Sequence, residues 1–158
     1  MSATNPFDLL AEATEEVLGT MFFVFTEAVV PAEVDLSGEK PSSRAIHTTL
    51  GFEGVWRGRV EFCLNPGMGR TLAANLLGQD EAAITDEMTL DAAREMTNMI
   101  VGRFLALLEP ERGLSLGLPQ ARLVDESDIT PLFHTDEAII LDSEDGMLFC
   151  RLFLEEEK

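Results

Sequence analysis

The sequence predicts an α+β fold, in which a mostly antiparallel sheet of about six strands packs against two or three helices in a single layered domain. Strand-like segments follow one another in runs instead of alternating with helices, an arrangement typical of α+β domains. The chain has 158 residues, of which 46% are hydrophobic. This is enough for one domain with a buried core but short for two, so residues 1–158 are expected to form one domain.

Three helices are expected. The first begins after Asn5, a good N-cap followed by a proline, and its apolar residues recur at helical spacing as far as Met21. A second amphipathic segment extends over residues 68–78 and ends in a glycine. The third and longest covers residues 88–108, ahead of Pro110.

Six strands are expected around these helices. They are predicted at residues 22–34, 45–52, 55–64, 114–124, 132–141 and 147–154. The second and third form a hairpin joined near Gly51 and Gly54, and the last two form a hairpin joined by the turn Ser143-Glu-Asp-Gly146. A polar loop is expected over residues 37–43.

The charge of the chain excludes several classes of partner. There are 11 basic and 29 acidic residues, a formal net charge of −18. Such a chain repels nucleic acid and anionic membrane, because it releases no counterions from their phosphates. Neither is therefore expected as a partner, whereas a protein with basic residues around its own site is compatible with this charge.

Other features indicate a cytoplasmic protein. The first eight residues include no basic residue and no apolar signal core, so export is not expected. The longest uninterrupted apolar stretch is residues 21–25, far short of the roughly 20 residues that span a membrane. Cys63 and Cys150 both lie in apolar strand-like segments and are expected to be buried free thiols, as in a reducing compartment.

The third predicted helix has a polar stripe that core packing does not require. At about 100° per residue, Asp91, Glu95, Asn98 and Gly102 fall within roughly one 60° sector beside the apolar face. A solvated helix flank would explain the acids alone. A glycine inside a helix costs about 1 kcal/mol relative to alanine, however, and an asparagine there is also unfavourable. The stripe is therefore a candidate site, with Glu95 and Asn98 projecting past a clearing at Gly102.

These residues resemble the signature helix of the CheC/CheX/FliY chemotaxis phosphatases. The family pattern is Asp or Ser, three residues, Glu, two residues, Asn, and a proline some twenty residues later; here Pro119 lies at about that distance from Asn98. The resemblance extends over essentially the whole chain and implies a CheC-like fold. The first predicted helix offers Glu12-Ala-Thr-Glu15 or Glu16-Val-Leu-Gly19, and neither supplies the asparagine. One active site is therefore expected, as in the CheX branch.

The resemblance also implies a mechanism. The substrate would be the aspartyl phosphate of a CheY-like response regulator, whose own site supplies Mg²⁺ and a lysine, so the phosphatase needs no cofactor or metal of its own. Asn98 would orient the hydrolytic water and Glu95 would engage the lysine of the regulator. Asp91, Gly102 and Pro119 would support the site or bind the partner. Similar proteins of the CheX branch form homodimers through strands, so a homodimer is expected.

Alternative functions are less well supported by the residues. Gly113-Leu-Ser115-Leu-Gly117 matches the nucleophile motif of α/β-hydrolases, with Asp125 or Asp128 and His134 following, but that motif requires a strand before the serine and a helix after it. His47 and His134 have no Cys or His at ligand spacing, so they are not expected to bind a metal. The main alternative is a module of the same fold that binds a regulator without hydrolysing its phosphate.

Overall fold

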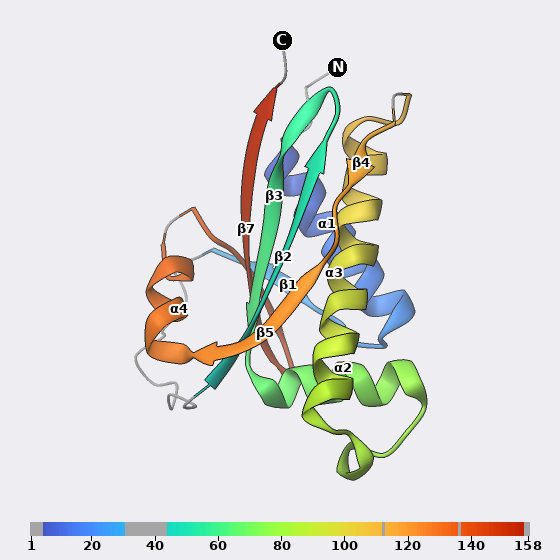
Figure 1. The fold of residues 1–158 in the computed structure, drawn as a ribbon, viewed down its shortest axis with the longest axis vertical. Coiled ribbons are helices and arrows are strands. Elements are labelled where there is room, and N and C mark those ends of the chain that lie inside the picture. Colours follow the sequence, from blue (N-terminus) through green and yellow to red (C-terminus); the bar gives the residue numbers. More distant parts are fainter. Residues whose placement is uncertain (1–4, 31–43, 112, 136, 157–158) are drawn as a thin grey trace.

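The computed structural model describes residues 5–30, 44–111, 113–135 and 137–156. Over these residues the chain forms four α-helices, one 3₁₀ helix and seven strands (Figure 1). The helices are α1 (Pro6–Met21), α2 (Pro66–Leu77), η2 (Glu81–Ala83), α3 (Asp86–Leu108) and α4 (Glu126–Phe133). The strands are β1 (Glu27–Val29), β2 (Arg44–Glu53), β3 (Trp56–Leu64), β4 (Ser115–Leu116), β5 (Gln120–Asp125), β6 (Ile139–Ser143) and β7 (Gly146–Glu156).

The described strands form one sheet in the order β1-β6-β7-β3-β2-β4, and β5 also pairs with β2. Every pairing among them is antiparallel. The predicted α+β class is confirmed, although the described residues form seven strands and four α-helices where about six strands and two or three helices were expected. Both predicted hairpins, β2–β3 and β6–β7, are present.

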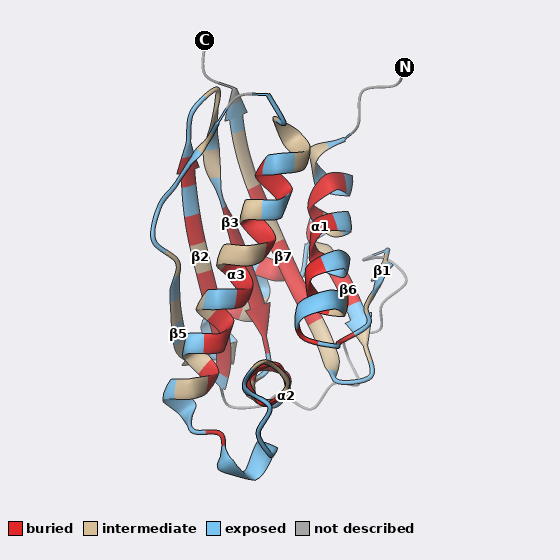
Figure 2. Cartoon of the chain, turned by 90° about the vertical axis from the view of Figure 1, so that its right-hand side faces the viewer, coloured by how far each residue is buried: buried red, intermediate tan, exposed pale blue. Residues whose placement is uncertain are grey.

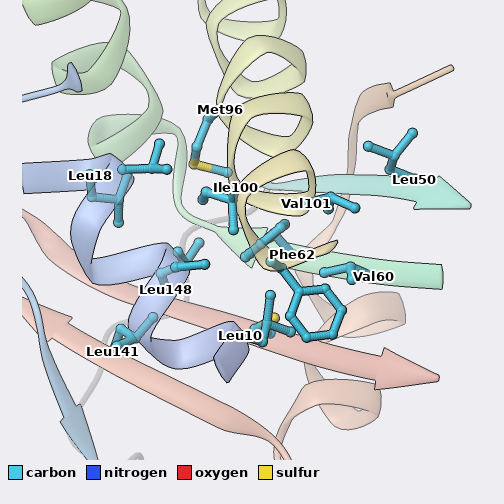
Figure 3. Packing of buried hydrophobic residues seen from close by; sticks show 14 of the residues in the cluster. Leu10, Leu18, Leu50, Val60, Phe62, Met96, Ile100, Val101, Leu141 and Leu148 are labelled. Carbon is cyan, nitrogen blue, oxygen red and sulfur yellow. The ribbon is translucent and has the colours of Figure 1, made fainter. Parts of the chain in front are cut away.

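Two helices cover one face of this sheet. Figure 2 shows α1 and α3 side by side in front of the strands, with α2 crossing their lower end. The main core lies between these helices and the sheet (Figure 3), and it includes the fully buried side chains of Leu10, Phe62 and Met96. Each such side chain contributes roughly 1.5–3 kcal/mol through removal of its surface from water. The core therefore fixes which side of α3 faces the sheet.

The helix boundaries follow the local sequence signals. In each of the three longer helices an Asn or Thr side chain accepts a hydrogen bond from a backbone N–H of the first turn, as expected of N-caps. The three bonds are Phe7 N to Asn5 Oδ1 (2.8 Å), Met68 N to Asn65 Oδ1 (2.7 Å) and Met88 N to Thr85 Oγ1 (3.1 Å). Gly78 ends α2 in the left-handed conformation, with φ of 65°.

The strand expected at residues 22–34 is largely wrong. The chain leaves α1 in a tight turn, with Phe22 as the C-cap and Phe23 in the left-handed region at φ 56°. Phe22 and Val24 are buried beneath this turn, so their packing and not strand pairing sets the backbone here. Of the described residues 22–30, only Glu27–Val29 pairs as a strand. Residues 31–34 and the polar loop expected over 37–43 lie outside the described residues.

Two later predictions are also corrected. The strand expected at residues 114–124 is divided into β4 and β5, with Gly117 between them. The strand expected at 132–141 begins only at Ile139, because residues 126–133 form α4. Ile129 and Phe133, four residues apart on α4, are buried against the face of the sheet opposite α1 and α3. This burial stabilises a helix even though Pro131 lies inside it.

The same opposite face holds a charged cluster around Glu61. Nε2 of His47 donates to Oε1 of Glu61 at 2.8 Å, Nε of Arg59 donates to Oε2 at 3.3 Å, and Arg151 lies 4.0 Å from Oε2. Burial alone would raise the pKa of Glu61, but the hydrogen bond from His47 and the charges of Arg151 and Arg59 hold that pKa below its ordinary value. A buried carboxylate in this position is thus kept ionised by its neighbours.

Both cysteines are free and buried, as predicted. Cys150 belongs to the main core and Cys63 to the smaller cluster under α4, so the sheet separates the two sulfur atoms. Burial raises the pKa of the Cys63 thiol to about 12 and raises that of Cys150 well above its ordinary value. Neither thiol has the character of a reactive nucleophile.

Candidate functional site

The polar stripe of α3 lies on the side of the helix that faces solvent. Asp91 and Glu95 are exposed, and Asn98 and Gly102 are half-buried. The opposite side of the helix faces the interior of the protein. The residues buried there against the sheet and α1 include Ala93, Met96, Thr97, Ile100 and Phe104. The prediction that the four stripe residues share one accessible side of a helix is confirmed.

Ion pairs flank the stripe on both sides. Arg94 pairs with Asp91 one turn before it and also donates from Nη1 to the carbonyl oxygen of Ala121 on β5, at 3.5 Å. Arg103 donates from Nε to Oε2 of Glu16 on α1, at 2.7 Å. Exposed pairs of this kind contribute little to stability. They do neutralise Asp91, at one end of the stripe, and Glu16, on the neighbouring helix, and they connect α3 to both α1 and β5.

Glu95 and Asn98 have no such partners. Within the part of the chain that the structure describes, neither side chain makes a hydrogen bond or an ion pair. The carboxylate of Glu95 and the amide of Asn98 lie three residues apart on one helix, so both project from the same turn. An unpaired acceptor and an unpaired amide with two donors are thus presented together to solvent.

The turn below Asn98 is fixed to the sheet. The hydroxyl of Thr97 lies 2.7 Å from the hydroxyl of Thr48 on β2 and 2.8 Å from the carbonyl oxygen of Ala93. Both threonines are fully buried. Because a buried polar pair tolerates little displacement, this contact sets the rotation of α3 about its axis and so the direction in which Asn98 points.

Gly102 has no packing role within the described chain. A Cβ atom placed on it would meet no other atom within 4 Å. Gly69 on α2 differs in this respect, because a Cβ there would lie 2.5 Å from Ile46. The open space at Gly102 is therefore available to an approaching molecule.

Pro119 lies in the segment between β4 and β5. This segment is held to the sheet by a hydrogen bond of 2.8 Å from the N–H of Gly117 to the carbonyl oxygen of Gly51. It passes alongside α3 (Figure 1). Pro119 thus belongs to a segment beside α3, and its supporting role stays a prediction.

The stripe spacing occurs a second time, on α1, in the Glu12–Glu15 register that the sequence analysis set aside because it lacks the asparagine. Asp8, Glu12, Glu15 and Gly19 have the same intervals as the α3 residues, with glutamate in the place of asparagine. Oε1 of Glu15 accepts a hydrogen bond of 3.2 Å from the N–H of Ala28. A Cβ on Gly19 would lie 3.6 Å from the ring of Phe25. The stripe on α1 is therefore engaged within the fold, whereas that on α3 is open.

The hydrolase and metal alternatives are not supported by the geometry. Ser115 begins the two-residue strand β4, and a glycine-containing connection follows it where the nucleophile motif needs a helix. His134 packs on the ring of Phe149, and His47 pairs with Glu61. Among the described residues, three or more His, Cys, Asp or Glu side chains nowhere gather as metal ligands would. No described helix is long and apolar enough to cross a membrane.

Comparison with known families identifies the family of the chain. The model of the family described as "Chemotaxis phosphatase CheX" matches residues 46–140, more than half of the chain. This chain belongs to the CheX family. The matched residues include all of α3 and Pro119, so the CheX assignment rests on the part of the chain that contains the stripe.

Solved structures of CheX proteins have the same fold. The chemotaxis protein CheX from Vibrio vulnificus is similar with a TM-score of 0.70 at 18% identity, over 98% of this chain and 100% of that one. CheX from Desulfovibrio desulfuricans gives 0.66 at 20% identity, over 95% and 99%. The CheX–CheY–BeF3–Mg complex from Borrelia burgdorferi gives 0.66 at 16% identity, over 98% and 100%. No curated protein sequence matches the chain.

Proposed function

We propose that this CheX-family protein hydrolyses the aspartyl phosphate of a CheY-like response regulator. The observation behind the proposal is that Glu95 and Asn98 project unpaired from one exposed turn of α3, while the carboxylates beside them are paired with arginines. Membership of a chemotaxis phosphatase family supports the reaction class. A CheX protein from Borrelia burgdorferi has been solved in complex with CheY, which supports the class of partner.

In this proposal Asn98 orients the hydrolytic water. An acyl phosphate is already reactive, and the divalent ion and lysine of the regulator's own site neutralise its charge. The phosphatase then needs to hold a water in line with phosphorus. An amide can do this because it offers one acceptor and two donors. The Thr97–Thr48 contact holds the backbone of this turn in place while it does so.

Glu95 has a separate role, which is to bind the lysine of the regulator. Its carboxylate is exposed and is not neutralised by any arginine of the described chain, unlike Asp91 and Glu16. A cation brought close to it gains an ion pair without displacing an existing one. Glu95 therefore fixes the orientation of the docked partner, and Asn98 acts on the reacting atoms.

The test is dephosphorylation of each CheY-like regulator of the host by purified variants. Asn98→Ala is expected to lower kcat by roughly 10²-fold or more, as loss of a positioning group does. Glu95→Ala is expected chiefly to raise KM. Gln79→Ala is the matched control, because it removes an exposed amide at the end of α2, away from the stripe. Dephosphorylation by Asn98→Ala at the wild-type rate would contradict the assignment.

A binding module of the same fold is the second candidate. Measurements on the wild-type protein alone distinguish such a module from a phosphatase. Tight binding to an activated regulator, with no change in the lifetime of its phosphoryl group, would favour binding without hydrolysis. The unpaired Asn98 favours the hydrolytic function, because binding alone does not require an amide at the centre of the contact.

We also propose a homodimer, formed through strands. β6 pairs with β7 only as far as Cys150, so residues 151–156 of β7 have a described strand partner, β3, on one edge alone. An unpaired edge of this length is a suitable surface for strand addition by a second copy. Sedimentation equilibrium at micromolar concentration tests this; a monomer throughout that range would contradict it.

A further inference from the structure

A shallow hollow lies beside the stripe, one turn beyond Asn98. Gly102 is at its border, Leu105, Leu114 and Leu116 form the apolar part of its lining, and Glu109 and Glu111 line it as well. The volume of the hollow is about 230 Å³. Because a Cβ on Gly102 would meet nothing within 4 Å, the glycine is not required by the packing of the described chain. Gly102 lowers the stability of the helix, and it occurs where the missing side chain leaves space on the outer surface of α3.

An exposed leucine follows the hollow along the same segment. Leu118 is 86% exposed, more than any other large hydrophobic side chain among the described residues. The residue before it, Gly117, is held to the carbonyl oxygen of Gly51 by a hydrogen bond of 2.8 Å. The side chain is therefore presented from a fixed backbone, which lowers the entropy lost when a partner covers it.

Two contacts locate this leucine along α3. At one end of the segment Leu116 lines the hollow that Gly102 borders, and at the other end the carbonyl oxygen of Ala121 accepts from Arg94. The segment thus passes along the helix in the opposite direction to the chain in α3. Leu118 lies between these ends and so at about the level of Asn98.

We propose that the hollow at Gly102 and the side chain of Leu118 form a docking flank, apolar at its leucines and acidic at Glu109 and Glu111, for the receiver domain of the regulator. This inference rests on the proposed function and names the residues that bind its protein substrate. An apolar side chain of the receiver enters the hollow, and Leu118 packs on the receiver surface beside it. Asn98, one turn from the hollow and at about the level of Leu118, is then directed at the phosphoryl group.

The position of the flank favours the receiver over a second copy of this chain. Gly102 belongs to the same stripe as Glu95 and Asn98, so a molecule seated on that turn lies directly beside the hollow. Glu109 and Glu111 line the hollow beside its leucines, and the exposed Glu95 lies on the adjoining stripe. This pattern suits a partner with an apolar contact next to basic residues, whereas a second copy would bring its own −18 charge. The unpaired edge of β7 is a separate surface.

The test measures the Kd of a CheY-like receiver domain activated with beryllofluoride and Mg²⁺. Gly102→Leu fills the hollow and is expected to raise Kd by about tenfold or more, and Leu118→Ser is expected to raise it by about tenfold. Gly102→Ala, which adds a single carbon, is expected to have a smaller effect than Gly102→Leu. Leu132→Ser is the matched control, because this leucine is 48% exposed on α4, across the sheet from the stripe.

The outcomes separate this inference from the proposed function. If the wild-type protein dephosphorylates a regulator and both Gly102→Leu and Leu118→Ser bind its receiver as the wild type does, the docking flank is wrong and the function stands. If the wild-type protein shortens the phosphoryl lifetime of no regulator, the proposed function is wrong whatever the Kd values, and if Asn98→Ala remains fully active, only the role given to Asn98 is wrong. If Gly102→Leu alters self-association but not receiver binding, the hollow binds a second copy and the inference is overturned. Thermal unfolding of each variant verifies that it folds.

Discussion

Thr97 on α3 and Thr48 on β2 form a buried contact of 2.7 Å between their hydroxyl groups, directly before Asn98 in the chain. Thr97 also lies 2.8 Å from the carbonyl oxygen of Ala93, one turn earlier. This is a fully buried polar link between the helix layer and the sheet. It connects the stability of the fold to the orientation of the site.

Thr97→Val is therefore expected to lower stability. The substitution keeps the shape of the side chain but leaves the hydroxyl of Thr48 without this partner, at a cost of about 1–3 kcal/mol. Thr48→Val should have a comparable effect, and the double variant should be destabilised by less than the sum of the two. Denaturant unfolding of the four proteins measures the coupling. Strict additivity would mean that the two hydroxyls do not stabilise each other.

Gly102→Ala is expected to raise the stability of the protein. The new methyl group meets no atom within 4 Å, so the substitution gains helix propensity without a clash. The gain should be about 0.5–1 kcal/mol, which corresponds to an increase of a few degrees in Tm for a domain of this size. Thermal unfolding followed by circular dichroism measures it. A lower Tm would show that Gly102 has a structural role within the monomer.

Glu61 is expected to contribute to the loss of stability in acid. Its pKa is lowered in the folded protein relative to the ordinary value of 4.5, so its ionised form favours the folded state. The contribution is fully present above the unfolded pKa, and it is lost as the pH falls from there through the lowered folded pKa. Unfolding free energies measured from pH 6 down to pH 3 should decrease less steeply for Glu61→Gln than for the wild type. Equal slopes would contradict the role of the His47–Arg59–Arg151 cluster.

The two thiols are expected to resist modification in the folded protein. Both are buried, and burial raises the pKa of Cys63 to about 12 and that of Cys150 well above its ordinary value. A disulfide reagent at pH 8 should therefore react slowly with the native protein and quickly in concentrated guanidinium. In the Cys63→Ser variant only Cys150 can react. Fast reaction of this thiol in the native protein would show that β7 opens locally.

Much of this fold follows from local signals in the sequence. The N-caps Asn5 and Asn65, the helix stop at Gly78 and the turn at Gly146 each determine a boundary through a few neighbouring atoms. The third helix was predicted to within two residues at its start, because its apolar repeat is long. These elements place the stripe on an exposed helix side, as the spacing indicated.

The errors arise where contacts between distant residues decide the structure. Residues 126–133 form a helix because Ile129 and Phe133 find a second apolar surface on the far face of the sheet, and no local signal reveals that surface. The turn after α1 depends on burial of Phe22 and on a hydrogen bond of 2.8 Å from Nδ2 of Asn75, 53 residues away. The hydrogen bond from the N–H of Ala28 to Glu15 likewise forms only in the folded chain, so the sequence alone could not reveal it.

The site also divides into predictable and unpredictable parts. Spacing placed Asp91, Glu95, Asn98 and Gly102 on one side of a helix, since helical geometry depends on the interval alone. It could not distinguish the paired Asp91 from the unpaired Glu95, because Arg94 and Arg103 choose their partners in three dimensions. The roles of Glu95 and Asn98 remain predictions.

Glu95 and Asn98 lie on one turn of a single helix that is fastened to α1, β2 and β5. Their separation is consequently set by helical geometry and involves no hinge. The described residues can therefore present both side chains to a partner without any opening or closing of the chain. We expect control of its activity to operate from outside, through the amount of protein, the supply of phosphorylated regulator, or a competitor that occupies the outer side of α3.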